Sequence, residues 1–325
     1  MRFSTRTIVR IFLLLLLSTA AFGLLSNLYG VIGRPLLTGA TQVPETGEAL
    51  RFAIVAPQYD HPYWEEVRRG AVAMGAKVGA HVDFYGPRRA SLAEQAQLLD
   101  QAAMAQVDGI ITQGLPDPQI DRAIARAVNR GIPVITVDTD SPGPRLAYVG
   151  SDNYAAGQLA ARELLRRRTG PAVIGIIRGN LGPEEMDDRV RGFRDTLAGE
   201  PDIRIAAVET SDLTRTAAGQ QALKIRREHP DVNIFYGTTA LDAVGVVQSL
   251  TTQGSAGRLI VIGWDDVGEA AELAQRGFIS SVVHQLPEEM GSRAVMLMEA
   301  YLRRDLRPQP MNYLPVELRG GGEAR

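Results

Sequence analysis

The segment GIITQGLPDPQIDRAIARAVNRGIPVITVD, residues 109–138, decides the fold class of this chain. Two short apolar runs, Gly109–Thr112 and Pro133–Val137, enclose a longer stretch, and turn residues bound each run. Such runs predict strands that are buried on both faces, and the longer stretch predicts a helix between them. The unit is typical of an α/β fold with a parallel sheet that helices cover on both faces.

The same alternation continues over the whole chain from Arg51 onward. The first helix candidate carries apolar residues from Val67 to Val78 at spacings of three or four, which gives one face for packing on a sheet. The other strand candidates are Phe52–Ala56, Val82–Tyr85, Leu146–Val149, Ala172–Ile177, Ile203–Val208, Asn233–Tyr236, Leu259–Gly263 and Ile279–Val283. About ten strands exceed one small α/β domain, so the pattern predicts two lobes, with a crossover at Gly150–Asn153.

The N-terminus has the composition of a membrane anchor. Arginines within the first ten residues precede an uncharged stretch, residues 11–33, which is long enough to span a bilayer as a helix. The positive charges before this stretch predict that the remainder of the chain lies outside the cytoplasm. A cleaved signal peptide is the alternative, because Thr19-Ala20-Ala21 resembles a small-residue cleavage site. Residues 34–50 are rich in Pro, Gly and Thr and are expected to form a linker.

Composition and missing motifs narrow the class of function. The net charge of −2 gives a polyanion such as DNA no overall attraction, so no nucleic-acid partner is expected. The chain has no cysteine, and its four histidines lack metal-ligand spacing, so neither metal nor cofactor is predicted. Hydrolase, metalloprotease, Walker and dinucleotide motifs are all missing from the sequence, which indicates a protein that is not an enzyme.

Polar residues follow two strand candidates at the position where open parallel sheets bind ligands. Asp138 ends the run 133–138, and Asp265 ends Leu259-Ile-Val-Ile-Gly-Trp-Asp265. Two carboxylates at matching strand ends in different halves suit a polyhydroxylated ligand, because each accepts several strong hydrogen bonds. The alternative is that each aspartate only caps a helix or turn that follows it.

Aromatic and cationic side chains complete the set of candidates. Tyr63 and Trp64 are expected in the first turn of the helix after the first strand, where they either contact a sugar ring or fill the core. Arg189 offers a fork of donors to hydroxyls, although a surface pair with Asp187 or Asp188 is its commoner use. Gln285 lies where a connection between lobes is expected.

Together these segments resemble the ribose-binding branch of the type I periplasmic binding proteins, from Arg51 to Glu317. The resemblance rests on His61-Pro-Tyr-Trp64, residues 133–138, Gly150-Ser-Asp-Asn153, Arg189-Val-Arg-Gly-Phe193, Val261-Ile-Gly-Trp-Asp265 and His284-Gln-Leu-Pro287. It implies two Rossmann-like lobes joined by three crossovers and closing over a ligand. It implies ligand-binding roles for His61, Tyr63, Trp64, Asp138, Arg189, Thr239, Asp265 and Gln285. Thr139 stands where ribose receptors have arginine and Leu213 where an aromatic is expected, which argues against ribose itself but not against a sugar.

The resemblance leads to an expected domain plan and two receptor roles. We expect a signal anchor at 1–33, a linker at 34–50, an N-terminal lobe of 51–152 plus 286–311, and a C-terminal lobe of 153–285 plus 312–325. The first role is capture of a monosaccharide for delivery to an ABC permease. The second is a membrane-anchored sugar sensor that docks on a histidine kinase. A repressor of the lactose type shares this fold but carries a helix-turn-helix where this chain has its apolar stretch.

Overall fold

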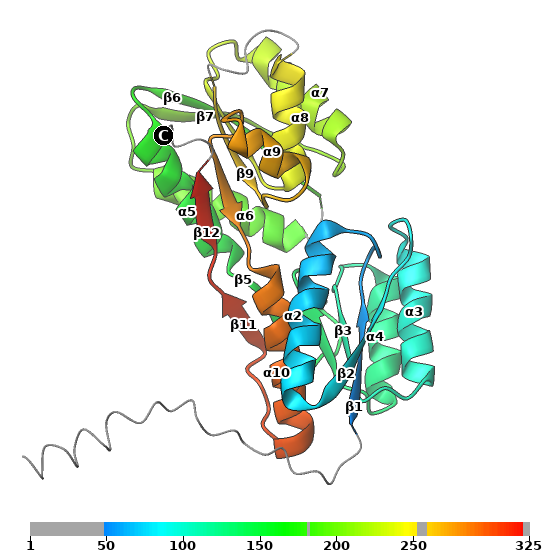
Figure 1. Cartoon of the computed structure of the whole chain (residues 1–325). Coiled ribbons are helices and arrows are strands. Elements are labelled where there is room, and N and C mark those ends of the chain that lie inside the picture. The colour runs from blue at the N-terminus through cyan, green and yellow to red at the C-terminus, as the bar shows by residue number, and fades with distance from the viewer. Residues whose placement is uncertain (1–48, 181–182, 252–258, 321–325) are drawn as a thin grey trace, which may run out of the picture. The chain divides into compact units, whose positions relative to one another are not determined.

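The computed structural model describes residues 49–180, 183–251 and 259–320, which form two six-stranded sheets flanked by helices (Figure 1). The first lobe has the strand order β11-β5-β4-β3-β1-β2, and all its pairs are parallel. Its elements are β1 (Leu50–Val55), α2 (Pro62–Val78), β2 (Ala80–Tyr85), α3 (Leu92–Met104), β3 (Gly109–Thr112), α4 (Pro118–Asn129), β4 (Val134–Val137), β5 (Ala147–Ser151), α10 (Pro287–Arg304) and β11 (Met311–Leu314).

The second lobe repeats this plan with the order β12-β10-β9-β8-β6-β7. Its elements are α5 (Asn153–Arg167), β6 (Ala172–Arg178), α6 (Pro183–Leu197), β7 (Ile203–Thr210), α7 (Arg215–Glu228), β8 (Ile234–Gly237), α8 (Ala240–Thr251), β9 (Ile260–Trp264), α9 (Glu269–Gln275), β10 (Ser281–His284) and β12 (Glu317–Gly320). Only β12, among the described strands, runs antiparallel to its neighbour. The prediction of two α/β lobes is therefore confirmed.

Each sheet is buried on both faces, as its continuous apolar strands require. Ile54 of β1 packs with α2 and α10, whereas the adjacent Val55 packs on the opposite face with α3 and α4. In the second lobe Ile176 and Ile177 divide in the same way between the α5–α6 face and the α7–α8–α9 face. The alternation follows from the two-residue period of a strand.

Glycines allow the helices on one face of each sheet to approach closely. A Cβ atom at Gly70 of α2 would lie 1.8 Å from the carbonyl oxygen of Glu288 in α10, and one at Gly157 of α5 would lie 2.1 Å from that of Arg189 in α6. Figure 1 shows α2 and α10 side by side in the first lobe. The second of these contacts fixes the backbone of a candidate site residue.

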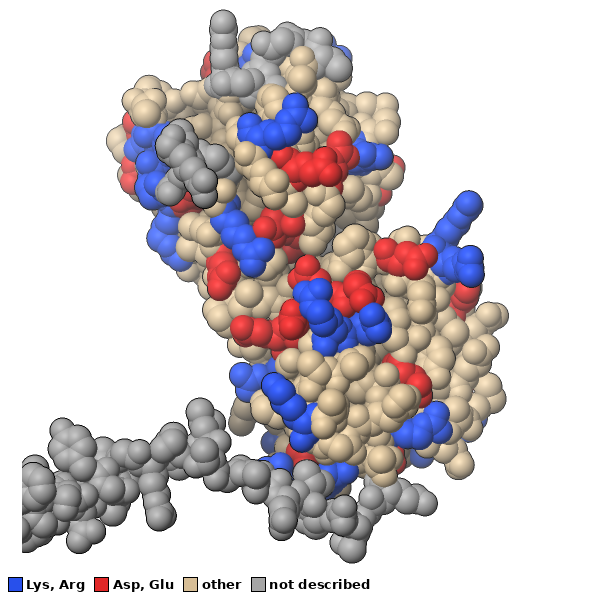
Figure 2. All heavy atoms as spheres, viewed as in Figure 1, with Lys and Arg blue, Asp and Glu red and all other residues tan. Residues whose placement is uncertain are grey.

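The chain passes between the sheets after β5, after β10 and between β11 and β12. The expected lobe boundary at 311/312 falls inside β11, whose residues pair with β5 of the first lobe. Residues 1–48, which include the predicted anchor and most of the linker, lie outside the described residues. No helix in 49–180, 183–251 or 259–320 combines the length and apolarity that a membrane span requires. On the face in Figure 2, acidic and basic side chains are interspersed.

Candidate functional site

A cavity of about 950 Å³ lies at the carboxyl ends of strands from both lobes. Side chains from the loops after β1, β3 and β4 of the first lobe and after β8 and β9 of the second line it. All the predicted ligand residues line this one cavity: His61, Tyr63, Trp64, Asp138, Arg189, Thr239, Asp265 and Gln285. The structure thus brings together residues that span more than two hundred positions of sequence.

Asp138 and Asp265 occupy equivalent positions in the two lobes. Asp138 follows β4 with a φ of 71°, and its N–H donates to the carbonyl of Val149 in β5 at 3.1 Å. Asp265 follows β9 with a φ of 48°, and its N–H donates to the carbonyl of Val283 in β10 at 2.9 Å. A left-handed backbone is costly for a residue with a side chain, so its use at both positions is typical of a functional site. The backbone of each aspartate is thus bonded to the strand that continues into the other lobe.

The Asp138 carboxylate is held by neighbours from the first lobe. It accepts hydrogen bonds from Tyr63 Oη at 3.1 Å and Gln113 Nε2 at 2.7 Å. Its backbone carbonyl accepts from Tyr148 Oη at 2.8 Å. In the turn that follows, it is the Asp140 carboxylate that accepts a hydrogen bond from the backbone, from the Ser141 N–H at 2.8 Å. The Asp138 carboxylate is therefore held by residues that line the cavity and does not cap the turn that follows it.

Asp265 is held more loosely. Gln285 Nε2 lies 3.3 Å from both of its carboxylate oxygens. Burial raises the pKa of Asp265 to about 6, although Arg189 opposes this shift. Helix α9 has Gly268 as its N-cap residue, so Asp265 does not cap this helix. The carboxylate has oxygen lone pairs to offer to a ligand.

Arg189 is buried and rigidly positioned. Its Nε donates to Asn153 Oδ1 at 2.8 Å and its Nη1 to the carbonyl of Thr238 at 2.7 Å. Its Cζ lies 3.5 Å from the centre of the Trp264 ring. The alternative of a surface pair is wrong for this residue, because Asp187 pairs with Arg178 and Asp188 pairs with Arg191.

The start of α2 supplies the aromatic wall. His61 is the N-cap residue of α2, and burial lowers its pKa. Tyr63 and Trp64, in the first turn, are 5% and 2% exposed and also belong to the core of the first lobe. These side chains thus serve both interpretations that the sequence left open, since they line the cavity and fill the core.

Gln285 and Thr239 have structural bonds as well as a place on the cavity. Gln285 Oε1 accepts from Ser151 Oγ at 2.9 Å, which joins two of the lobe connections. Thr239 and Asp242 cap helix α8 reciprocally: the Asp242 N–H donates to Thr239 Oγ1 at 3.2 Å, and the Thr239 N–H donates to Asp242 Oδ2 at 3.0 Å.

Two further residues, Gln113 and Glu185, line the cavity but were not predicted from the sequence. Gln113 directly follows β3, so the strand-end rule that found Asp138 applies to it equally. Glu185 lies in the first turn of α6 and accepts a hydrogen bond from the Asp140 N–H of the other lobe at 3.2 Å. Nothing in the sequence signals that contact.

Two α/β lobes, three connections and a cavity between them that carries carboxylates, a guanidinium and amides define a two-lobe solute-binding protein. This chain belongs to the family described as "Periplasmic binding protein domain", whose model matches residues 52–305. The D-allose-binding periplasmic protein of Escherichia coli (strain K12) is 24% identical over 260 residues, 77% of this chain and 84% of that protein. Such relatives are substrate-binding proteins rather than enzymes, which confirms the predicted absence of catalysis.

Solved structures show the same fold. GanP, a glucose-galactose binding protein from Geobacillus stearothermophilus, is 39% identical with a TM-score of 0.77, covering 85% of this chain and 98% of its own. A structure of a XylFII–LytSN complex is 28% identical with a TM-score of 0.72, covering 85% and 99%. The predicted resemblance to sugar-binding periplasmic proteins is confirmed at the level of the family.

Proposed function

We propose that this protein is an extracytoplasmic receptor that closes around a monosaccharide. One observation carries the proposal: the carboxylates of Asp138 and Asp265, from equivalent strand ends of different lobes, line a single cavity. A ligand that bonds to both carboxylates holds the lobes together. Because such a ligand binds the closed arrangement better than an open one, its binding shifts the population toward closure.

The side chains around the carboxylates match a sugar. Carboxylate oxygens accept from vicinal hydroxyls, while the Arg189 guanidinium and the Gln113 and Gln285 amides supply donors. Tyr63 and Trp64 present aromatic surface to the C–H faces of a ring. We assign ligand contacts to His61, Tyr63, Trp64, Asp138, Arg189, Thr239, Asp265 and Gln285, and add Gln113.

The named relatives support a hexose. GanP is a glucose-galactose binding protein, and the Escherichia coli relative binds D-allose. We therefore place glucose, galactose and allose at the head of a ligand panel, followed by pentoses and polyols.

Thermal unfolding of the full chain, in a detergent without a sugar headgroup, tests the proposal. One sugar is expected to raise the stability of the fold by about 2.7 kcal/mol at a hundred times its Kd. Asp265→Ala is expected to weaken binding of that sugar by roughly 2–4 kcal/mol, because the sugar hydroxyls and Arg189 lose a charged partner. A flat response to the whole panel contradicts a sugar receptor, and an unchanged affinity in the variant removes Asp265 from the site.

Delivery of the sugar to an ABC permease is the role that the transport relatives favour. A sensor role, in which the anchored receptor docks on a histidine kinase, has one specific support: the relative XylFII forms a complex with a second protein, LytSN. Deleting the gene separates the roles. Loss of uptake of labelled sugar supports transport, whereas normal uptake with loss of a sugar-induced transcript supports the sensor.

We further propose that residues 1–33 anchor the receptor in the cytoplasmic membrane with its lobes outside. Fractionation of cells that express the full chain tests this point. An anchored chain stays with the membranes after an alkaline carbonate wash and keeps its N-terminus, whereas a chain cleaved near residue 21 is released.

A further inference from the structure

The charges that line the cavity are unbalanced. Among the described residues, its lining includes four carboxylates, Asp138, Glu185, Asp265 and Glu269, and two guanidiniums, Arg189 and Arg215. Burial lowers the pKa of His61, so its imidazole adds no positive charge at neutral pH. The formal charge of this lining is therefore −2.

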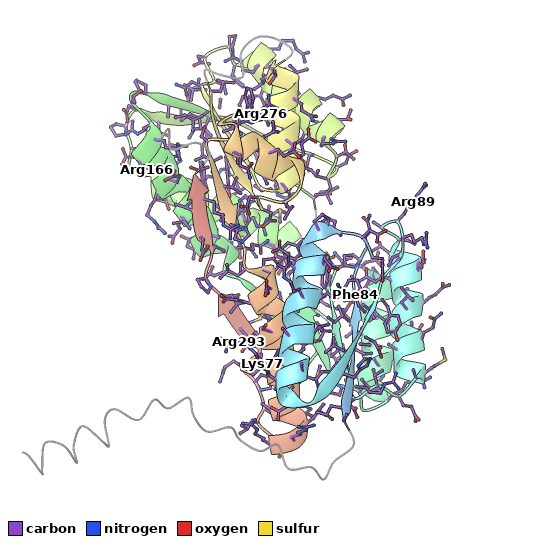
Figure 3. The ribbon with its side chains drawn as sticks, viewed as in Figure 1. Lys77, Phe84, Arg89, Arg166, Arg276 and Arg293 are labelled. Carbon is purple, nitrogen blue, oxygen red and sulfur yellow. The ribbon has the colours of Figure 1, made fainter. Side chains whose placement is uncertain are left out.

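Neither guanidinium offsets the inner carboxylates fully. Arg215 is paired with Glu269 at 2.5 Å, so these two side chains neutralise each other. Arg189, whose hydrogen-bond partners Asn153 and Thr238 are uncharged, brings one positive charge to three carboxylates. Arg89, which lies one residue before the lining residue Ala90, is exposed and projects out of the fold (Figure 3). The inner part of the cavity is left with Asp138, Glu185 and Asp265 around Arg189.

Among the three inner carboxylates, Glu185 differs from Asp138 and Asp265 in where it lies in the fold. It comes from a helix start rather than from a strand end, and its Oε1 accepts a hydrogen bond from the Asp140 N–H of the other lobe at 3.2 Å. Burial raises its pKa, and the nearby Asp138 charge acts in the same direction while Arg189 opposes it. Glu185 therefore lies in a partly desolvated place within reach of both the Asp138 and the Arg189 charges.

We propose that Glu185 is a specificity-determining residue, which excludes sugars that carry a carboxylate or phosphate and favours uncharged and amino sugars. This inference rests on the proposed sugar-binding function. In a partly desolvated site, a like charge repels and an opposite charge attracts over several ångströms far more strongly than in water. The residue therefore changes the ranking of ligands that share one ring but differ in charge.

The test uses three ligands with the same ring: a neutral aldohexose that the protein binds, its hexuronate and its 2-amino-2-deoxy derivative. Their affinities for the full chain are measured calorimetrically at pH 7 and low salt, in a detergent without a sugar headgroup. The variants are Glu185→Gln, Glu185→Asp and the matched control Glu184→Gln. Glu184 is exposed in the same helical turn and does not line the cavity. Thermal unfolding confirms that each variant is folded.

In Glu185→Gln we expect the uronate-to-neutral affinity ratio to rise at least tenfold and the amine-to-neutral ratio to fall. A purely structural role would move all three affinities together and leave these ratios unchanged. Glu185→Asp keeps the charge and is expected to keep both ratios within about threefold of wild type, as is Glu184→Gln. Unchanged ratios in Glu185→Gln overturn the inference. A wild-type chain that binds no sugar overturns the receptor proposal, and this inference with it.

Discussion

The Arg189 guanidinium lies 3.5 Å from the centre of the Trp264 ring, and both side chains are buried. The ring therefore supports the cation rather than presenting its face to a ligand. Trp264 is itself held by a hydrogen bond from its Nε1 to Tyr236 Oη at 3.0 Å, and Tyr236 stacks on Phe193. This stack fixes the one inner guanidinium of the cavity.

Arg189→Lys is expected to weaken sugar binding by about 2–3 kcal/mol, because an ammonium cannot bond Asn153 and Thr238 together while lying flat on Trp264. Calorimetry with the ligand found in the panel measures this loss. Arg191→Lys is the matched control, since Arg191 is exposed on the same helix. Equal affinities in the two variants would contradict a role for Arg189.

Asp265 links sugar affinity to pH. Its carboxyl has a pKa of about 6 in the fold, so the ionised form that accepts hydrogen bonds is lost as the pH falls through 6. We expect affinity to fall with it. The charges facing Asp265 are those of Arg189, Asp138 and His284, and Gln285 is its hydrogen-bond donor. Calorimetric titrations from pH 8 to pH 5 measure the change, and a flat profile would show that the ligand does not use this carboxylate.

The same carboxyl destabilises the empty protein. The folded pKa of about 6 lies above the reference value of 3.8, so the folded state binds the proton more tightly and ionisation costs stability as pH rises. Ligand-free Asp265→Asn is therefore expected to be more stable than wild type at pH 7.5, by roughly 3 kcal/mol, and within about 1 kcal/mol of it near pH 4. Urea unfolding at both pH values measures the difference. A variant less stable than wild type at pH 7.5 contradicts the argument.

Gly157→Ala is expected to lower both stability and affinity. The new Cβ would lie 2.1 Å from the Arg189 carbonyl, so α5 and α6 must separate, at a cost of about 1–3 kcal/mol. The control is Gly170→Ala, where no atom lies within 4 Å. Thermal unfolding and sugar titration of both variants give the comparison, and matching curves would show that this close approach is not needed.

Ser151 is expected to control the orientation of the Gln285 amide. Its Oγ–H donates to Oε1, which leaves Nε2 toward Asp265. In Ser151→Ala the amide loses this restraint, so we expect weaker sugar binding. We also expect affinity to be lost at a higher pH than in wild type, because Gln285 stabilises the ionised form of Asp265. Ser151→Thr keeps the hydroxyl and is expected to restore both properties. If Thr behaves like Ala, the hydrogen bond is not the cause.

The site could be predicted as far as it depends on strand ends. Asp138 and Asp265 follow continuous buried runs, so their place at the edge of a sheet is readable from sequence. The place of Glu185 cannot be predicted from the sequence, because its contact with Asp140 depends on how the two lobes meet. Strands β11 and β12 were missed for a different reason. Only Leu314 among their residues is buried, so neither strand carries an apolar run.

The close contact of α10 with α2 limits when the first lobe can fold during synthesis of the chain. Met290, Ala294 and Met298 of α10 are fully buried in the core of the first lobe, although they follow all but one strand of the second. Synthesis must therefore reach β11 before the lobe that begins at residue 49 has a closed core. Loss of α10 is expected to unfold the lobe that contains β1, and an incomplete chain leaves apolar sheet surface exposed and prone to aggregation.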